Sequence, residues 1–428
     1  MSSGAKMAAS LPQLDINWVR QQFPALRQTV NEQPAVFFDA PGGTQVPQRV
    51  IEVIANYLST SNANTGGAFV TSRRSDQIIA EARAAMADFL NCAGDEVVFG
   101  PNMTTLTFAL SRAIGRELKK GDELLVTCLD HDANVSPWVC LEERGVKVRT
   151  ADIKPADCTL DMFDLSAKIR RSTRLVAVGW AANAVGTIND VSEAVRLAHA
   201  VGAMAFIDAV HYAPHAPIDV RALDCDFLAC SSYKFFGPHL GILYGKREQL
   251  QRLRPYKLRA CTEQLPDRWE TGTQNHECLA GLIAAVDYLA DLGRHHDPQA
   301  SSRREALLSA YGVIRQHERV LAEQLIAGLL NIPGLTFYGI KDPSQFDQRT
   351  PTVAIHMVGR SPRELAAHLG ECGMFTWDGD YYAIDLAERL GVLQSGGMLR
   401  IGLAHYNTAD EVERLLVELQ ALAKSAGS

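Results

Sequence analysis

The chain has 428 residues, of which 47% are hydrophobic and 21% are charged. These proportions are ordinary for a globular protein, and a chain of this length can bury a large core without disulfides or metal ions. The net charge is -7, and both signs are mixed along the chain, so there is no basic surface for nucleic acid and we expect no such partner.

No segment has the character of a membrane span or a secretion signal. No apolar run approaches the ~20 residues of a membrane-spanning helix, and residues 1–15 lack the apolar stretch of a signal peptide. The nine cysteines are scattered, without a CxxC pair or a Cys/His cluster at zinc spacing. We therefore expect a cytoplasmic protein with reduced thiols, no membrane partner and no metal site.

The first two-thirds of the chain alternates between two kinds of segment. Residues 1–12 are expected to be a loose segment, and apolar residues at helical spacing predict a short helix over 15–23. The β-rich runs that follow are 36–38, 97–99, 124–127, 175–179, 205–207, 227–229 and 242–244. The helical stretches are 50–58, 77–90, 105–114, 191–200 and 279–289. This alternation predicts an α/β fold with a mostly parallel seven-stranded sheet covered by helices on both faces.

The pattern changes near residue 290, where a charged segment leads into a long helix that is expected to end near Leu330. Further strands are expected at 335–338, 353–357 and 398–402, and helices at 362–371 and 409–423. This part is typical of a smaller α+β domain. Residues 36–290 would then form the large domain, and residues 1–35 and 291–428 the small one.

The segment with the clearest chemical signal surrounds Lys234. It reads Cys-Ser-Ser-Tyr-Lys-Phe-Phe-Gly-Pro over residues 230–238, directly after an apolar strand. A lysine that aromatic neighbours shield from water has a lowered pKa and can form a Schiff base with an aldehyde cofactor. The alternative is a surface lysine whose apolar stem packs on the protein while its ammonium stays in water.

A second segment supplies an acid on the same side of the predicted sheet. Asp208 ends the strand at 205–207 and precedes Lys234 by one βαβ step. Because ligands bind at the carboxyl ends of parallel strands, we expect the two side chains to face one crevice. An aspartate there can pair with the ring nitrogen of pyridoxal 5′-phosphate (PLP). The alternative is an aspartate that caps a helix.

Together these segments resemble the class V aminotransferase group of fold-type I PLP enzymes, and within it the cysteine desulfurase-like proteins. The resemblance extends from the Phe-Phe-Asp-Ala-Pro-Gly-Gly segment at 37–43 to the Arg-Ile-Gly-Leu-Ala-His-Tyr-Asn segment at 400–407. It implies a fold-type I transferase fold, bound PLP, a small amino-acid substrate and a homodimer whose active sites are shared across the interface.

The resemblance assigns a phosphate site to hydroxyl residues from two segments. Thr104 and Thr105 precede a predicted helix and resemble the phosphate cradle, which agrees with the affinity of a helix N-terminus for phosphate. The alternative is a threonine that only caps the helix. Ser231 resembles a further phosphate ligand. Thr273, in the segment 268–275, resembles the residue that reaches the cofactor phosphate of the neighbouring subunit.

Other residues match those that surround the cofactor ring. His131 resembles the histidine that stacks on the ring, and Asn183 the asparagine near its phenolic oxygen. His211 takes the place of a glutamine at that oxygen, and Tyr233 replaces a histidine just before Lys234. Arg400 matches the arginine that binds the substrate α-carboxylate, as a planar guanidinium can do through two parallel hydrogen bonds. Its alternative is a strand arginine facing solvent.

The sequence departs from cysteine desulfurases where they carry a catalytic cysteine on a loop. Tyr382 stands at that position and Trp377 where an arginine is expected, and a phenol cannot carry a persulfide. Cys372 precedes the loop at the end of a predicted helix, so we do not expect it to replace the missing thiol. Segment 62–67 also lacks a histidine and an arginine that many desulfurases carry there.

These departures leave open the role of the loop and the type of reaction. The aromatic and acidic residues of 377–382 could line a substrate pocket, offer a phenol for proton transfer, or only pack the loop. With Lys234, Asp208 and His131 as catalytic residues, we expect C–S (β-) lyase chemistry on a small L-amino acid through a Schiff base on Lys234. Class V transamination, epimerisation and a non-catalytic PLP-fold scaffold are the alternatives.

Overall fold

The computed structural model describes residues 13–426, so the loose segment expected over 1–12 lies outside the described residues. A seven-stranded sheet forms its centre, in the order β4-β12-β11-β10-β9-β5-β6. Strand β12 runs in the opposite direction to the other six strands, which are parallel to one another. The strands are β4 (Val97–Gly100), β5 (Glu123–Thr127), β6 (Lys147–Ala151), β9 (Thr173–Gly179), β10 (Met204–Asp208), β11 (Phe227–Ser231) and β12 (Gly241–Gly245). The predicted α/β class and mostly parallel sheet are confirmed.

Two errors offset each other in the predicted set of strands. The run at 36–38 does not enter the central sheet, because β3 (Val36–Phe37) pairs with β15 (Met374–Phe375) instead. The strand missed by the sequence analysis is β6, whose residues include Lys147 and Arg149 and are mostly exposed or half-buried. An edge strand of this kind lacks the continuous apolar run that marks a strand covered on both faces.

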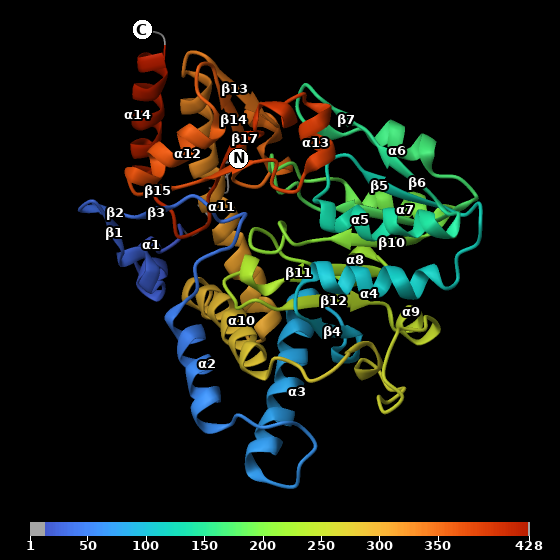
Figure 1. The fold of residues 1–428 in the computed structure, drawn as a ribbon. Coiled ribbons are helices and arrows are strands. Elements are labelled where there is room, and N and C mark those ends of the chain that lie inside the picture. Colours follow the sequence, from blue (N-terminus) through green and yellow to red (C-terminus); the bar gives the residue numbers. More distant parts are fainter. Residues whose placement is uncertain (1–12, 427–428) are drawn as a thin grey trace, which may run out of the picture.

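Helices cover both faces of this sheet (Figure 1). Successive side chains of a strand point to opposite faces, and in β4 Val97 packs in one apolar core while Val98 packs in another. The helices before the C-terminal part are α1 (Ile16–Gln22), α2 (Gln48–Thr60), α3 (Val70–Leu90), α4 (Met103–Gly115), α5 (Ser136–Val139), α6 (Met162–Lys168), α7 (Val191–Ala200), α8 (Val220–Leu223), α9 (Arg247–Arg252) and α10 (His276–His296). Helix α3 begins at Val70, whereas the sequence predicted a start at residue 77. The prediction missed the first two turns because they are largely polar and lack helical periodicity.

The C-terminal part forms a second layer around a four-stranded antiparallel sheet, β13-β14-β17-β16. Its strands are β13 (Leu335–Tyr338), β14 (Thr352–Met357), β16 (Trp377–Gly379) and β17 (Met398–Gly402), and its helices are α11 (Arg303–Leu330), α12 (Pro362–Glu371), α13 (Ile384–Arg389) and α14 (Ala409–Ala426). Short paired strands lie outside the two sheets, namely β1 (Thr29–Val30) with β2 (Gln33–Pro34) and β7 (Ile153–Lys154) with β8 (Thr159–Leu160).

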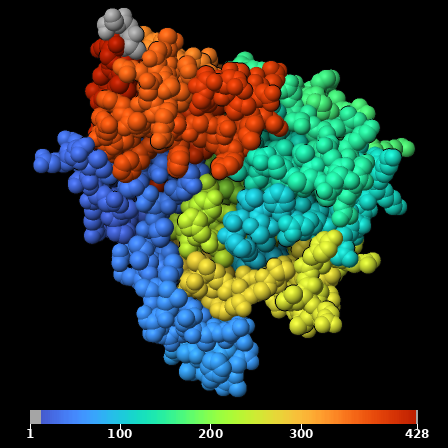
Figure 2. Space-filling model, in the orientation of Figure 1, coloured from blue at the N-terminus to red at the C-terminus, as the bar shows by residue number. Residues whose placement is uncertain are grey.

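Helix α11 joins the two layers. Its buried residues up to Ile314 pack in the core of the central sheet, and those from Leu321 onward pack with β14, β17 and α14. Figure 2 shows the C-terminal residues, in orange and red, in contact with the green central part. The division into domains 36–290 and 1–35 with 291–428 stays a proposal. Within residues 13–426, no helix is both long and apolar enough to cross a membrane.

Candidate active site

A cavity of about 460 Å³ opens where β5, β9, β10 and β11 end, as ligand sites of parallel sheets do. Its wall brings together most of the predicted site residues: Thr104, His131, Asn183, Asp208, His211, Ser231, Tyr233, Lys234, Trp377, Tyr382 and Arg400. Two predicted residues do not line it. Thr105 donates its hydroxyl proton to Asn102 at 2.9 Å, and Thr273 is exposed on a loop.

Lys234 lies in a short turn (Ser232–Lys234) directly after β11. Its Nζ donates hydrogen bonds to the backbone carbonyls of Pro41 and Gly42, the second at 3.0 Å. Burial, reinforced by the positive charge of Arg400, lowers the pKa of the ammonium group to about 7. A substantial fraction of this amine is therefore neutral at neutral pH, unlike that of an ordinary surface lysine. A neutral amine is the nucleophile and base that aldehyde chemistry requires.

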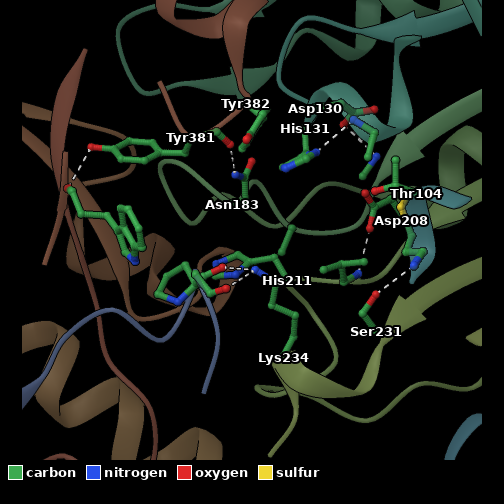
Figure 3. A pocket seen from close by; sticks show the side chains of 18 of the residues that line it. Thr104, Asp130, His131, Asn183, Asp208, His211, Ser231, Lys234, Tyr381 and Tyr382 are labelled. Atoms are coloured by element: carbon green, nitrogen blue, oxygen red, sulfur yellow. Dashed lines mark hydrogen bonds between the residues drawn. The ribbon is translucent and has the colours of Figure 1, made fainter. Parts of the chain in front are cut away.

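Asp208 ends β10 and faces the same cavity as Lys234 and Ser231 (Figure 3). Its Oδ1 accepts a hydrogen bond from the backbone N–H of Val210 at 2.8 Å. This contact stabilises a turn, and the next helix begins only at Val220, so Asp208 is not a helix cap. Burial raises the pKa of the carboxyl group to about 6, which still leaves it mostly ionised at neutral pH. It can therefore pair with a cationic ring nitrogen.

The far end of the cavity is suited to an anion. Helix α4 begins at Met103, whose backbone N–H donates to the Ser231 hydroxyl at 3.0 Å. The Thr104 N–H and hydroxyl, exposed at this cavity wall, have no hydrogen-bond partner within residues 13–426. Unpaired donors at a helix N-terminus, where the helix dipole is positive, are a binding site for phosphate.

His131 lies across the cavity, after β5. Its Nδ1 accepts a hydrogen bond from the N–H of Ala133 at 3.0 Å, and burial lowers the pKa of the ring to about 4, so the imidazole is neutral. The preceding Asp130 was missed by the sequence analysis. It is 4% exposed, and its two oxygens accept hydrogen bonds from the Gly179 N–H and the Asn134 amide, each at 2.8 Å. Like Asp208, it is an acid just beyond a buried strand, and that signal could have found it.

Arg400, on β17, is a buried cation without an ion-pair partner among the described residues. Its Nη1 donates to the backbone carbonyl of Asn183 at 3.0 Å, and its guanidinium lies 4.3 Å from the centre of the Tyr381 ring. The Nε is buried without a hydrogen-bond acceptor. Although burial lowers its pKa to about 10, the group remains charged at neutral pH. Because an unpaired buried charge is costly, this arrangement is suited to an anionic ligand.

Two further buried polar residues lie at or near this cavity: His211 lines it, and Asp39 is close enough to Arg400 and Lys234 for their charges to act on its carboxyl group. Burial raises the pKa of Asp39, another acid that the sequence analysis missed, to about 6, although Arg400 and Lys234 oppose this. Its Oδ1 is buried without a hydrogen-bond partner. The Nε2 of His211 lies 3.1 Å from the Thr350 hydroxyl, and burial holds the pKa of this histidine well below its usual range. His211 is therefore neutral, and its ring lines the cavity.

The sequence model of the aminotransferase class-V family matches residues 36–415. The chain belongs to this family. It is 32% identical to a cysteine desulfurase of Dickeya dadantii, over 96% of this chain and 98% of the other, and 32% identical to one of Yersinia pseudotuberculosis over 96% and 99%.

Comparison with solved structures leads to the same family. The apo structure of a cysteine desulfurase from Thermococcus onnurineus has a TM-score of 0.86, with 26% identity over 98% of this chain and 100% of that one. Cysteine desulfurase CsdA (S-sulfonic acid) of Escherichia coli has a TM-score of 0.82, with 27% identity over 97% and 99%. The predicted fold-type I transferase fold, the class V family and its cysteine desulfurase-like character are confirmed. Class-V aminotransferases and cysteine desulfurases are PLP-dependent enzymes.

This family member closes its cavity with an aromatic segment, residues 377–382. Tyr381 and Tyr382 both have a φ of 58°, in the left-handed region that non-glycine residues rarely adopt. Hydrogen bonds hold the segment in place: the Asp132 N–H donates to the Tyr382 carbonyl at 2.7 Å, and the Asn183 amide to the Tyr381 carbonyl at 2.9 Å. Trp377 approaches so closely that a Cβ on Gly42 would lie 2.6 Å from its Nε1.

No cysteine lines the cavity, as far as residues 13–426 describe it. The Tyr382 ring lies there instead, 5.3 Å from the His131 ring and tilted by 34° (Figure 3). Cys372 is outside the lining, and its Sγ lies 3.7 Å from His368. Residues 62–67 are also outside the lining. The catalytic thiol that the family resemblance leads one to expect is therefore absent from this site.

Proposed function

We propose that this protein is a PLP-dependent C–S lyase that acts on a small L-amino acid by β-elimination. The observation that carries the proposal is the composition of the cavity wall. It contains the lysine, aspartate and arginine of a PLP enzyme, but a tyrosine where a desulfurase has its thiol. Without a thiol to accept sulfur as a persulfide, the sulfur has to leave the substrate as sulfide.

The donor set fits PLP from end to end. Lys234 would hold its aldehyde carbon, because its lowered pKa makes the amine available. Asp208 would pair with the ring nitrogen, His131 would stack on the ring, and Thr104 with Ser231 would hold the phosphate. Asn183 and His211 would contact the phenolic oxygen side, where the buried Oδ1 of Asn183 lacks a donor.

When bound, the cofactor supplies an electron sink for the negative charge that develops at the substrate Cα. The side chains of the protein do the rest. Arg400 would fix the α-carboxylate through its unpaired donors, and so fix which Cα bond is broken. The freed Nζ of Lys234 would take the Cα proton and then protonate the leaving sulfur, giving sulfide, pyruvate and ammonia from cysteine and water. Residues 377–382 would exclude water while this happens.

The shared active site of a homodimer is part of this proposal. Thr273 is exposed in the single chain and lies outside the cavity wall, which is consistent with a residue that acts on a second subunit. Mixing Lys234→Ala chains with Thr273→Glu chains tests this. If Thr273 acts across the interface, one site of each mixed dimer is intact and activity returns. If it acts within its own chain, the mixture stays inactive.

The deciding experiment is an incubation with L-cysteine, PLP and a reductant, in which sulfide, alanine and pyruvate are quantified together. Equal sulfide and pyruvate support β-elimination. Sulfide with equal alanine would overturn it in favour of desulfuration with another sulfur acceptor. A yellow protein that forms no product from cysteine would favour a transaminase or an epimerase. A protein that stays colourless with PLP would favour the non-catalytic scaffold.

A further inference from the structure

Three side chains with metal-binding atoms meet on the C-terminal part of the chain, outside the cavity wall. His368 lies in the last turn of α12, Cys372 directly follows that helix, and Glu418 projects from α14. In Figure 1 these two helices lie side by side, on the side of the second layer away from the central sheet. The proposed reaction uses none of the three.

The three ligand atoms converge on one point. The His368 Nε2 lies 2.6 Å from the Glu418 Oε1 and 3.7 Å from the Cys372 Sγ, and all three atoms lie within 4.8 Å of one another. His368 and Cys372 are four residues apart, a spacing that puts both on one face of a helix. Glu418 is 50 residues further along than His368, so no local sequence motif contains the set.

One separation within the cluster matches an edge of a tetrahedron around zinc. With Zn–S at ~2.3 Å and Zn–N at ~2.0–2.1 Å, tetrahedral ligands place sulfur and nitrogen about 3.6 Å apart. The Sγ–Nε2 separation already has this value to within a tenth of an ångström. The Sγ–Oε1 pair lies within 4.8 Å, and the hydrogen-bonded Nε2–Oε1 pair, at 2.6 Å, is closer than the roughly 3.3 Å of a tetrahedral N–O edge. An ion that replaces the shared proton would separate this pair.

The same geometry argues against a Cys–His–Glu catalytic triad. In a triad, the acid and the nucleophile contact opposite nitrogens of the imidazole. Here the thiol and the carboxylate both approach Nε2. A single nitrogen cannot relay a proton between them, whereas three ligands directed at one centre are the arrangement that a cation requires.

The local charges and access also suit a divalent cation. Glu418 and Glu371 are the acids that act on the Cys372 thiol. The nearby positive charge, Arg414, donates its hydrogen bonds to the backbone carbonyls of Pro34 and Cys372. The side chains of His368 and Glu418 are 39% and 30% exposed, so an ion can enter and keep a water ligand.

We propose that His368, Cys372 and Glu418 bind one zinc ion, with water as the fourth ligand. The thiol releases its proton when its sulfur binds the ion. The ion joins the end of α12 to α14, directly before the segment that leads through β15 to residues 377–382. The ion therefore fixes the start of the segment that closes the cavity. With this proposal we replace the expectation of no metal site.

The test uses the full-length protein loaded with PLP and freed of metal with a chelator. Titration with Co²⁺, a spectroscopic substitute for Zn²⁺, should show one ion per chain, tetrahedral visible bands and a thiolate-to-cobalt charge-transfer band. Zn²⁺ calorimetry should give the same stoichiometry. Cys372→Ser should remove the charge-transfer band, and His368→Gln and Glu418→Gln should weaken binding at least ~10–100-fold.

Cys140→Ser is the matched control, because Cys140 is an exposed cysteine outside the cluster. It should leave binding unchanged. Zn²⁺ should raise the Tm of the starting protein and not that of Glu418→Gln, a variant that keeps the shape of the side chain. Absence of binding, or binding that Cys372→Ser does not weaken, would overturn the proposal. The readouts do not depend on turnover, so they also hold if the proposed lyase activity is wrong.

Discussion

The residues of the two cavity walls are held in place in different ways. Asp208 and Ser231 end buried strands of the central sheet and Lys234 follows one, so the ends of those strands fix their positions. The opposite wall is the segment 377–382, where Trp377 and Tyr382 are 51% and 67% exposed and Gly379, Tyr381 and Tyr382 have positive φ. Apart from His211 and Tyr233, the wall on the sheet has the residue types that the family resemblance predicts, and the closing segment does not. This difference underlies our proposal that the protein shares its cofactor chemistry with cysteine desulfurases but differs from them in the fate of the substrate sulfur.

The largest expected effect comes from the sheet wall. Lys234→Ala removes the amine that would hold the cofactor and move the substrate protons, so we expect activity to fall by at least ~10³-fold and the yellow colour of the bound cofactor to disappear. Lys246→Ala is the control, because that lysine is ion-paired to Asp224 and lies outside the cavity wall. A Lys234→Ala protein with full activity would show that the sheet wall is not the catalytic one.

Asp208→Asn tests the charge at the same wall. The substitution keeps the shape but removes the negative charge that would hold the ring nitrogen protonated, so we expect kcat to fall by roughly 10²-fold or more. Asp130→Asn is the matched comparison. Burial raises the pKa of Asp130 to about 8, so the substitution removes little charge there at pH 7, although it replaces one of two accepting oxygens with a donor. Equal losses in the two variants would contradict a specific role for Asp208.

Arg400 connects the two walls, since it contacts Asn183 and the Tyr381 ring. A carboxylate bound by charge-assisted hydrogen bonds gains about 1.5–3 kcal/mol from each. Arg400→Ala should therefore lower kcat/KM by roughly 10²-fold, mainly through KM, and Arg400→Lys by less, because it keeps the charge without the planar fork. Arg389→Ala, which breaks an exposed ion pair with Asp152, should leave the kinetics unchanged. Steady-state kinetics with unchanged KM in Arg400→Ala would exclude carboxylate binding.

The sheet wall could be predicted from the sequence and the closing segment could not, for a physical reason. Asp208 and Lys234 follow continuous apolar runs, so their place at one sheet edge follows from topology. Asp130 also follows an apolar strand and could have been found by the same signal, whereas Asp39 is placed by a bridge to Gly402. Contacts of this kind depend on tertiary packing. The edge strand β6 was missed because a half-exposed strand lacks an apolar run.

The two tyrosines of the closing segment have different expected roles. The Tyr381 hydroxyl donates to the Met398 carbonyl, so Tyr381→Phe should lower the free energy of unfolding by about 1 kcal/mol. The Tyr382 hydroxyl has no partner in the described part of the chain, so Tyr382→Phe should leave stability unchanged. If Lys234 moves both protons, Tyr382→Phe should also change kcat by less than ~3-fold. A loss near ~10²-fold would instead assign the phenol a role in proton transfer.

The last test concerns the pH at which the stripped protein captures PLP. Capture needs the neutral amine of Lys234, and burial lowers the pKa of that amine to about 7. The capture rate, followed by absorbance, should rise about tenfold per pH unit below pH 7 and level off above it. The unfolded chain keeps this lysine protonated up to about pH 10.5. Its contribution to the free energy of unfolding should therefore increase as the pH rises from 7 toward 10.5.

Arg400→Leu sharpens this last test, because Arg400 is the second cause of the lowered pKa after burial. Without that cation, the pKa of Lys234 should rise toward its ordinary value, and the capture rate should level off at a higher pH than in the unaltered protein. Asp208 and Asp39 act in the opposite direction on Lys234, so replacing either with an amide should lower the levelling-off pH. A rate that climbs tenfold per unit through pH 9 in the unaltered protein would show an ordinary lysine. The two walls would then not cooperate electrostatically as their geometry indicates.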